Sequence, residues 1–182
     1  DTQVYSNTGG QRSKATPRAA TAKFATGGKF VAKKDLGMLA ADYGHAYVAQ
    51  IAIGSDPKQT GRALQEATQF RGPSLVIAYA TCIAQGIDLT HTVDQMQAAV
   101  QSGYWPLYRY NPALLELGRN PMQLDSEEPT MSFKDYALRE NRYRALVKSN
   151  PDQAEHLMEL AQSDVTKRWH AYKCKAFGVE AP

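Results

Sequence analysis

The sequence predicts an α/β fold of the doubly wound type, with a mainly parallel sheet and a C-terminal helical extension. Two observations support this prediction. Segments with strand character alternate with segments of helical character between residues 35 and 110. In addition, residues 74–80 (Ser-Leu-Val-Ile-Ala-Tyr-Ala) form a nearly continuous apolar run, typical of a strand covered on both faces by helices. In folds of this type, ligands bind at the carboxyl ends of the strands.

The N-terminal segment is expected to be the carboxyl end of a strand that runs into a ligand loop. Residues 1–10 are Asp-Thr-Gln-Val-Tyr-Ser-Asn-Thr-Gly-Gly. Small polar residues and glycines let the backbone approach a phosphate or a metal closely. Residues 17–26 are compatible with a helix closed by two glycines, and residues 35–43 with a short helix that also ends at a glycine.

Two strand–helix pairs follow. Residues 47–53 predict a strand, and the Ser-Asp-Pro sequence at 55–57 supplies an N-cap and a first-turn proline for a helix that continues to Phe70. After the apolar strand, residues 91–102 predict another helix. Residues 107–110 predict a short strand, which the Asn-Pro sequence after it ends.

The last third of the chain changes character, and we expect a boundary between residues 1–119 and residues 120–182. Two prolines and an acidic cluster in residues 120–129 indicate a linker. A helix is expected over residues 131–146, and the Asn-Pro-Asp sequence at 150–152 begins a final helix. That helix has an apolar stripe with spacings of three and four: Ala154, Leu157, Met158, Ala161, Val165, Trp169 and Tyr172. The stripe predicts a face that docks on the parent protein or on a second subunit.

The composition favours a globular protein of the cytoplasm. The chain has 182 residues, of which 43% are hydrophobic and 21% are charged. No apolar stretch approaches the roughly 20 residues that a membrane helix needs. Two cysteines provide no disulfide framework, which suits a reducing compartment. The sequence contains no zinc-finger, helix-turn-helix or RNA-binding signature, so we expect no nucleic-acid partner.

The positive charge is unevenly distributed along the chain. Residues 12–34 contain seven basic residues and no acidic one. These residues are Arg12, Lys14, Arg18, Lys23, Lys29, Lys33 and Lys34. The stretch predicts either a solvated basic face or a surface that holds phosphate or an acidic partner.

Three further positions carry groups that could bind a metal ion. The hydroxyl of Thr2 and the backbone carbonyl of Val4 are hard oxygen donors of the kind that Mg²⁺ prefers. Cys82 follows the apolar strand at its carboxyl end, where a functional thiol would be placed. A single cysteine in this position is also typical of a small buried hydrophobic residue, and the sequence has no Cys-x-x-Cys spacing for an iron–sulfur cluster.

Four segments of the sequence together resemble one enzyme family. They are the opening run of residues 1–11, Ala-Thr-Pro at 15–17, Ile-Ala-Tyr-Ala-Thr-Cys at 77–82, and Ser-Gly-Tyr-Trp-Pro-Leu-Tyr-Arg at 102–109. The chain resembles the C-terminal region of the pyruvate:ferredoxin (flavodoxin) oxidoreductases, from Asp1 to about residue 146. The resemblance implies the C-terminal half of a thiamine-diphosphate-binding domain, with a sheet that is incomplete at its N-terminus.

The resemblance also implies a cofactor site in the opening loop. Thiamine diphosphate enzymes hold a Mg²⁺ ion with an upstream aspartate of a Gly-Asp-Gly motif, a side-chain oxygen in a later loop and a carbonyl two residues further on. Thr2 and Val4 match the last two groups. Asn7 matches the family's asparagine beside the thiazolium ring and the substrate carboxylate, where it would orient or polarise the substrate. The Gly-Asp-Gly half does not occur in this sequence.

In the same family a cysteine in the Tyr-Ala-Thr-Cys context completes the 4Fe-4S cluster nearest the thiamine, and three cysteines of an upstream domain supply the rest. Cys82 matches that ligand. Cys174, on the final helix, has no counterpart and is interpreted as structural or exposed.

The activity implied by the resemblance is oxidative decarboxylation of pyruvate with coenzyme A to acetyl-CoA and CO₂. Electrons would pass through 4Fe-4S clusters to ferredoxin or flavodoxin, and the family forms homodimers. This chain is not expected to be active without the remainder of the parent enzyme. Two other hypotheses stay open: a sibling enzyme that acts on another 2-oxo acid, and a non-catalytic α/β module that binds phosphate through the basic stretch.

Overall fold

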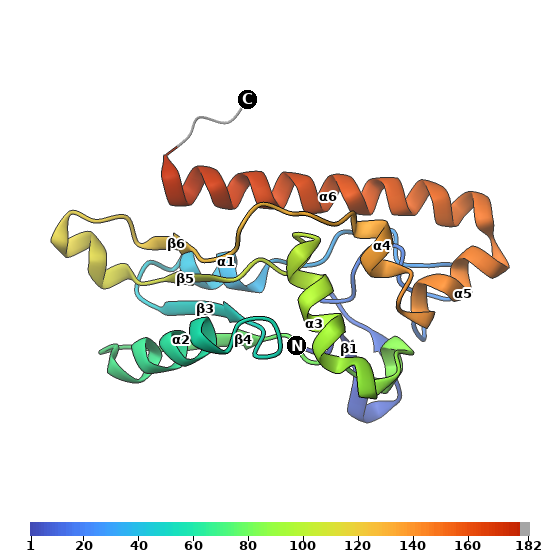
Figure 1. Ribbon diagram of the computed structural model, residues 1–182, viewed down its shortest axis with the longest axis horizontal. Helices are drawn as coiled ribbons and strands as arrows, with labels where there is room; N and C mark the ends of the chain where they lie inside the picture. The colour runs from blue at the N-terminus through green and yellow to red at the C-terminus, as the bar shows by residue number, and fades with distance from the viewer. Residues whose placement is uncertain (179–182) are drawn as a thin grey trace.

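A four-stranded sheet with the strand order β4-β3-β5-β6 forms the centre of the protein. The computed structural model describes residues 1–178, so the last four residues of the expected C-terminal extension lie outside the described residues. The strands are β3 (Tyr47–Ile51), β4 (Ser74–Ala78), β5 (Tyr108–Tyr110) and β6 (Met122–Leu124). Helices cover both faces of the sheet (Figure 1), so the α/β class is confirmed.

The sheet is mixed, whereas a mainly parallel sheet was expected within this chain. β3 and β4 are parallel, but β5 runs antiparallel to β3, and β6 runs antiparallel to β5. A short connection through the 3₁₀ helix η4 (Pro112–Leu117) joins β5 to β6, and such hairpin connections join antiparallel neighbours. β6 lies within the segment that the sequence indicated as a linker.

β4 lies at one edge of this sheet and is partly exposed, although coverage on both faces was expected. The backbone of Asp1 continues the sheet beyond β4. Its nitrogen donates to the Ala78 carbonyl at 2.6 Å, and its carbonyl accepts from the Ala80 nitrogen at 3.3 Å. Two bonds that flank a residue of the neighbouring strand in this way are the pattern of a parallel pair. The opening segment therefore lies beside the carboxyl end of β4.

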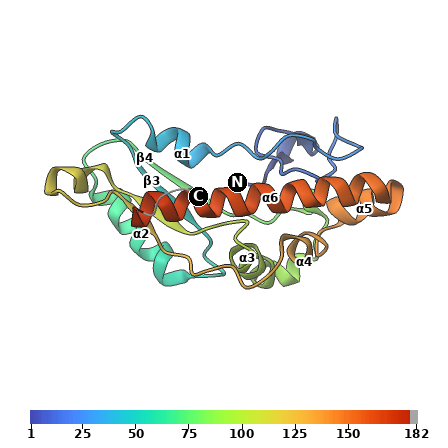
Figure 2. The ribbon, with the colours of Figure 1, turned by 90° about the horizontal axis from the view of Figure 1, so that it is seen from above.

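Two helices lie on opposite faces of the sheet (Figure 2). α1 (Leu36–Ala41) begins at Asp35, whose carboxylate accepts from a backbone N–H of the first turn. α2 (Pro57–Gln69) is capped by Asp56 and begins with the predicted proline. α1 packs closely against β5: a Cβ on Gly37 would lie 1.7 Å from the Tyr108 hydroxyl, so only glycine fits there.

α6 (Pro151–Phe177) runs along the β6 edge of the sheet (Figures 1 and 2). All seven residues of the predicted apolar stripe are buried, but their partners lie within this chain. The stripe packs against α4 (Phe133–Ala137), α5 (Asn141–Ser149) and β6. The expectation that it docks on another part of the parent protein was therefore wrong.

Two expected helices differ in the structure. Residues 131–146 form two helices, α4 and α5, because Glu140 between them is extended and fully buried, with its side chain bonded to distant residues. Residues 17–26 form turns and bridges instead of a helix. Ala19 and Phe24 have positive φ angles of 68° and 66°, and Ala19 bonds to the backbone of Lys29. Backbone hydrogen bonds to residues outside this segment therefore outweigh its intrinsic helix propensity.

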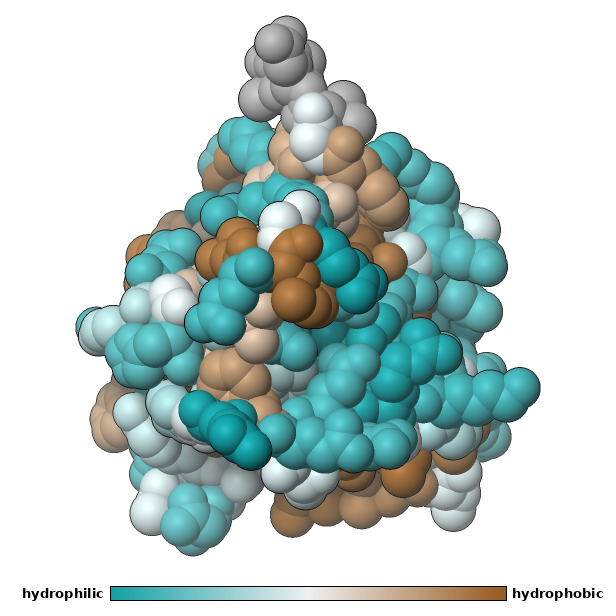
Figure 3. Space-filling model, turned by 90° about the vertical axis from the view of Figure 1, so that its left-hand side faces the viewer, coloured by the Kyte–Doolittle hydropathy of each residue, from teal (hydrophilic) through white to brown (hydrophobic). Residues whose placement is uncertain are grey.

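The connection from β4 to β5 is helical. It contains the 3₁₀ helices η2 (Ile83–Gln85) and η3 (Leu89–His91) and then α3 (Thr92–Gln101). α3 and the opening loop lie on the side of the sheet away from the β5–β6 turn, and α5 lies at the opposite end of the molecule (Figure 1). Figure 3 views the end that carries this turn, which is mostly hydrophilic with small apolar clusters. Within residues 1–178, no helix is long and apolar enough to cross a membrane.

The packing of α6 predicts that two leucines on that helix contribute differently to the stability of the fold. Leu157 is 1% exposed in the core, whereas Leu160 is 37% exposed on the outer face. We expect Leu157→Ala to lower the free energy of unfolding by about 2–5 kcal/mol, because it removes buried methyl groups and leaves a cavity. Leu160→Ala should change it by less than about 1 kcal/mol. Urea unfolding of both variants tests this, and equal losses would contradict the observed orientation of the helix.

Candidate functional site

The opening loop forms a small antiparallel hairpin at the carboxyl end of β4. β1 (Val4–Tyr5) pairs with β2 (Gln11–Arg12), and the 3₁₀ helix η1 (Ser6–Thr8) lies between them. Gly9 ends η1 with a φ of 115°, a backbone conformation that side-chain-bearing residues rarely adopt. Asn7 lies on η1 and is exposed, in the same loop as Thr2 and Val4.

The two oxygen donors expected for Mg²⁺ lie side by side. The Thr2 hydroxyl Oγ1 is 3.0 Å from the carbonyl oxygen of Val4, to which it donates a hydrogen bond. Neighbouring ligands of an octahedral Mg²⁺ ion, each about 2.1 Å from the metal, are separated by about 3.0 Å. The pair therefore fits two adjacent positions of a magnesium shell without moving apart, with the hydroxyl proton turned away from the carbonyl.

Gln3, between the two donors, has the backbone conformation that brings them together. Its φ is 66°, rare for a residue with a side chain, and the side chain is 1% exposed. Its backbone N–H donates to Asp1 Oδ1 at 2.8 Å, and its carbonyl accepts from Thr16 Oγ1 at 2.5 Å. Its side-chain oxygen accepts from Arg142 Nη2 at 2.7 Å. Sequence reasoning missed Gln3, because a positive φ outside glycine leaves no compositional signal.

Arg142 is itself held by a buried carboxylate. It pairs with Glu140, and the two side chains are 1% and 0% exposed. Glu140 Oε1 also accepts from Gln95 Nε2 at 2.7 Å and from the Tyr136 hydroxyl at 3.0 Å. The Tyr79 hydroxyl donates to the same oxygen at 3.2 Å. Burial raises the pKa of Tyr79 well above its usual value and the Glu140 charge adds to this, so Tyr79 stays a proton donor.

Cys82 lies at the start of η2, half-buried and close to the opening loop. Its Sγ accepts from the Ala84 backbone N–H at 3.4 Å. A Cβ on Gly10 of the opening loop would be 3.6 Å from the Ala84 Cβ, so the two loops are in contact range. A hollow of about 520 Å³ is lined by both loops and by the start of α5.

The chain offers a single thiol for a cluster at this place. Among residues 1–178, no group of three or more His, Cys, Asp or Glu side chains is placed to hold a metal ion. Cys174 lies on α6, where its Sγ is 3.4 Å from His170 Nε2. A 4Fe-4S cluster needs four thiolates, of which this loop would supply one, Cys82.

Three of the seven basic residues in the expected basic stretch have partners inside the protein. Lys29 is 5% exposed and donates to the carbonyls of Lys14 and Thr16; burial lowers the pKa of Lys29 to about 8. Lys33 pairs with Asp1 at 2.5 Å and lies over the Trp105 ring. Burial, with the charges of Arg168 and Arg142 adding to it, lowers the pKa of Lys33 to about 7, while the Asp35 carboxylate favours the charged form.

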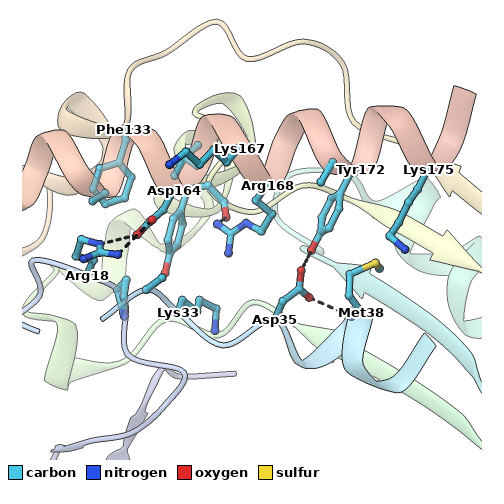
Figure 4. Close-up of a pocket in the computed structure, with 16 residues that line it drawn as sticks. Arg18, Lys33, Asp35, Met38, Phe133, Asp164, Lys167, Arg168, Tyr172 and Lys175 are labelled. Carbon is cyan, nitrogen blue, oxygen red and sulfur yellow. Dashed lines mark hydrogen bonds and ion pairs between the residues drawn. The ribbon is translucent and has the colours of Figure 1, made fainter. Parts of the chain in front are cut away.

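Arg18, the third of these, pairs with Asp164 of α6 at 2.6 Å, at one side of a cavity of about 350 Å³ (Figure 4). On its other side, the Tyr172 hydroxyl donates to Asp35 at 2.6 Å. The stretch is therefore not one continuous solvated face, because part of its charge ties residues 12–34 to the rest of the fold.

The sequence is closely similar to curated enzymes along almost its whole length. No protein-family model matches the chain. A pyruvate-flavodoxin oxidoreductase of Nostoc sp. is 53% identical over 173 residues, which are 95% of this chain and 14% of the relative. A pyruvate:ferredoxin oxidoreductase of Moorella thermoacetica is 52% identical over 178 residues, 98% of this chain and 15% of the relative. A pyruvate-flavodoxin oxidoreductase of Klebsiella pneumoniae is 51% identical over 175 residues, which are 95% of this chain and 15% of the relative. The chain belongs to the family of the pyruvate:ferredoxin and pyruvate-flavodoxin oxidoreductases.

The chain spans about one seventh of the length of these oxidoreductases. The expected family is thereby confirmed.

Proposed function

We propose that this chain forms one part of the reaction centre of a pyruvate:ferredoxin/flavodoxin oxidoreductase. The parent enzyme would convert pyruvate and coenzyme A into acetyl-CoA and CO₂, and two electrons would leave through 4Fe-4S clusters to ferredoxin or flavodoxin. One observation carries the proposal. The Thr2–Val4 oxygen pair and Cys82 lie at the same end of the sheet, in a chain about half identical to enzymes of that name.

The residues of the opening loop would hold the cofactor. Thr2 Oγ1 and the Val4 carbonyl would bind Mg²⁺ next to the diphosphate, since their 3.0 Å separation matches a magnesium shell. Thiamine diphosphate, when bound, would supply a nucleophilic thiazolium carbon and a cationic ring that accepts the electron pair released by decarboxylation. Asn7, exposed on η1, would orient the substrate carboxylate with its side-chain amide. The Arg142–Gln3 bond would keep the loop in its binding conformation.

Cys82 would be the cluster ligand of this chain. Its Sγ accepts an N–H donor, and such bonds to the ligand sulfur help to set a cluster's reduction potential. Cys82 and Cys174 are both free thiols, which suits the reducing cytoplasm in which we place the enzyme. The remainder of the enzyme and a homodimeric partner would supply the other cluster cysteines and most substrate contacts.

The test is anaerobic reduction of a viologen dye by the full-length parent protein, with thiamine diphosphate, Mg²⁺ and coenzyme A. We expect reduction that requires both pyruvate and coenzyme A. Reduction with another 2-oxo acid and not with pyruvate would identify a sibling enzyme of different specificity. A full-length protein that holds neither thiamine diphosphate nor iron would refute the proposal.

A further inference from the structure

Gln85 connects the two loops of the candidate site through its buried side chain. It lies at the end of η2 and is 0% exposed. Its Nε2 donates to the carbonyl oxygens of Thr2 and Ala80, both at 3.2 Å. Its Oε1 accepts from the backbone N–H of Cys82 at 3.1 Å. Both N–H groups and the oxygen of this amide are therefore used.

The groups that Gln85 joins are those that our proposed function places closest to the chemistry. Thr2 is the first of the two oxygen donors, and Cys82 is the cluster ligand; the contact with Thr2 spans 83 positions in the sequence. The third contact, to Ala80, fixes the amide to the end of β4. The site thus has a side-chain link between the loop for the thiamine cofactor and the loop for the cluster, in addition to their separate connections to the sheet.

A change at Gln85 would disturb both loops at once. Without the amide, the Thr2 and Ala80 carbonyls and the Cys82 N–H lose buried partners, and each such loss costs more than the net energy of one hydrogen bond. The 3₁₀ turn of η2 would also lose the reciprocal capping pair between Cys82 and Gln85. The donation from Ala84 N–H to Cys82 Sγ depends on that turn.

We propose that Gln85 is a positioning residue that fixes the separation of the thiamine loop and the cluster ligand. This inference rests on the proposed function. Electron transfer between two centres weakens steeply as their separation grows, so a rigid link across this gap keeps the electron path short. Gln85 acts only through Thr2 and Cys82 and contacts neither reactant.

The test replaces Gln85 by methionine in the full-length enzyme and measures two quantities besides turnover. We expect Gln85→Met to weaken thiamine diphosphate binding by about 10–100-fold in the presence of Mg²⁺, the range found for residues that support metal ligands. We also expect the midpoint potential of one cluster to become more negative, because the Cys82 thiolate loses its N–H donor. Gln69→Met, at an exposed position on α2, is the matched control and should change neither quantity.

The outcomes separate this inference from the proposed function. If the wild-type enzyme binds thiamine diphosphate and iron but Gln85→Met leaves both quantities unchanged, or alters only one, the positioning role is refuted. If the wild type binds neither, the proposed function itself fails. Should Gln85→Met not fold, Gln85→Glu keeps an acceptor for the Cys82 N–H and removes the donors to Thr2 and Ala80. That variant should still weaken thiamine diphosphate binding several-fold, and unchanged binding would overturn the inference.

Discussion

Cys82→Ser in the full-length enzyme is expected to remove one iron–sulfur cluster, about four iron atoms per chain. The half-buried thiol lies at the carboxyl end of β4, where its Sγ already accepts an N–H bond. Serine oxygen is a poor substitute for thiolate as a ligand of iron in such clusters. Pyruvate-dependent dye reduction should fall by at least about 100-fold, since the electrons lose their first acceptor. Iron analysis and electron paramagnetic resonance of the reduced protein provide the measurements.

The control for this variant lies on α6. Cys174→Ser makes the same chemical change at a half-buried thiol near His170 and should leave the iron content unchanged. Thiamine diphosphate binding should be largely retained in Cys82→Ser, because the Thr2–Val4 pair remains intact. Full iron content and activity in Cys82→Ser would eliminate the assignment of this residue as a cluster ligand.

Thr2→Val is expected to have the second large effect, on magnesium and thiamine diphosphate. Valine has nearly the same shape as threonine but lacks the hydroxyl that meets the Val4 carbonyl at 3.0 Å. We expect the Mg²⁺ concentration for half-maximal activity to rise by about 10–100-fold, with a parallel loss of thiamine diphosphate affinity. Titration of the cofactor-free enzyme with each ligand measures both effects.

Thr8 provides the matched control in the same loop. Its hydroxyl donates to Gln11 Oε1 on the exposed side, so Thr8→Val should weaken the hairpin slightly and leave the magnesium requirement near the wild-type value. Equal behaviour of the two variants would show that loop stability, and not a metal ligand, is the role of Thr2. Iron content should be normal in both.

Local signals predicted those parts of the fold that depend on neighbouring residues. The Asp56–Pro57 pair predicted the start of α2 at the observed residue, and Asn150 predicted the start of α6. The apolar stripe of α6 was also found from its spacing. Its partner was not, because a stripe shows that a helix face is covered but not by what.

Features fixed by distant residues could not be predicted in the same way. The break between α4 and α5 depends on Glu140, whose partners Tyr79 and Gln95 lie 61 and 45 positions away. β6 is three residues long, too short for an alternating pattern to stand out. In the site, the resemblance to a family pointed to Thr2, Val4 and Cys82. The side chains that support them were found only in the structure.

The Arg142–Gln3 contact has a consequence for the order of events on the ribosome. The two residues are 139 positions apart, which corresponds to about 7–28 s of synthesis at roughly 5–20 residues per second. Until Arg142 has emerged, the side chain of Gln3 lacks its distant partner, and only the local bonds to Asp1 and Thr16 hold its positive-φ backbone. The opening loop of the nascent chain therefore gains its last anchor only after all four strands of the sheet have been synthesised.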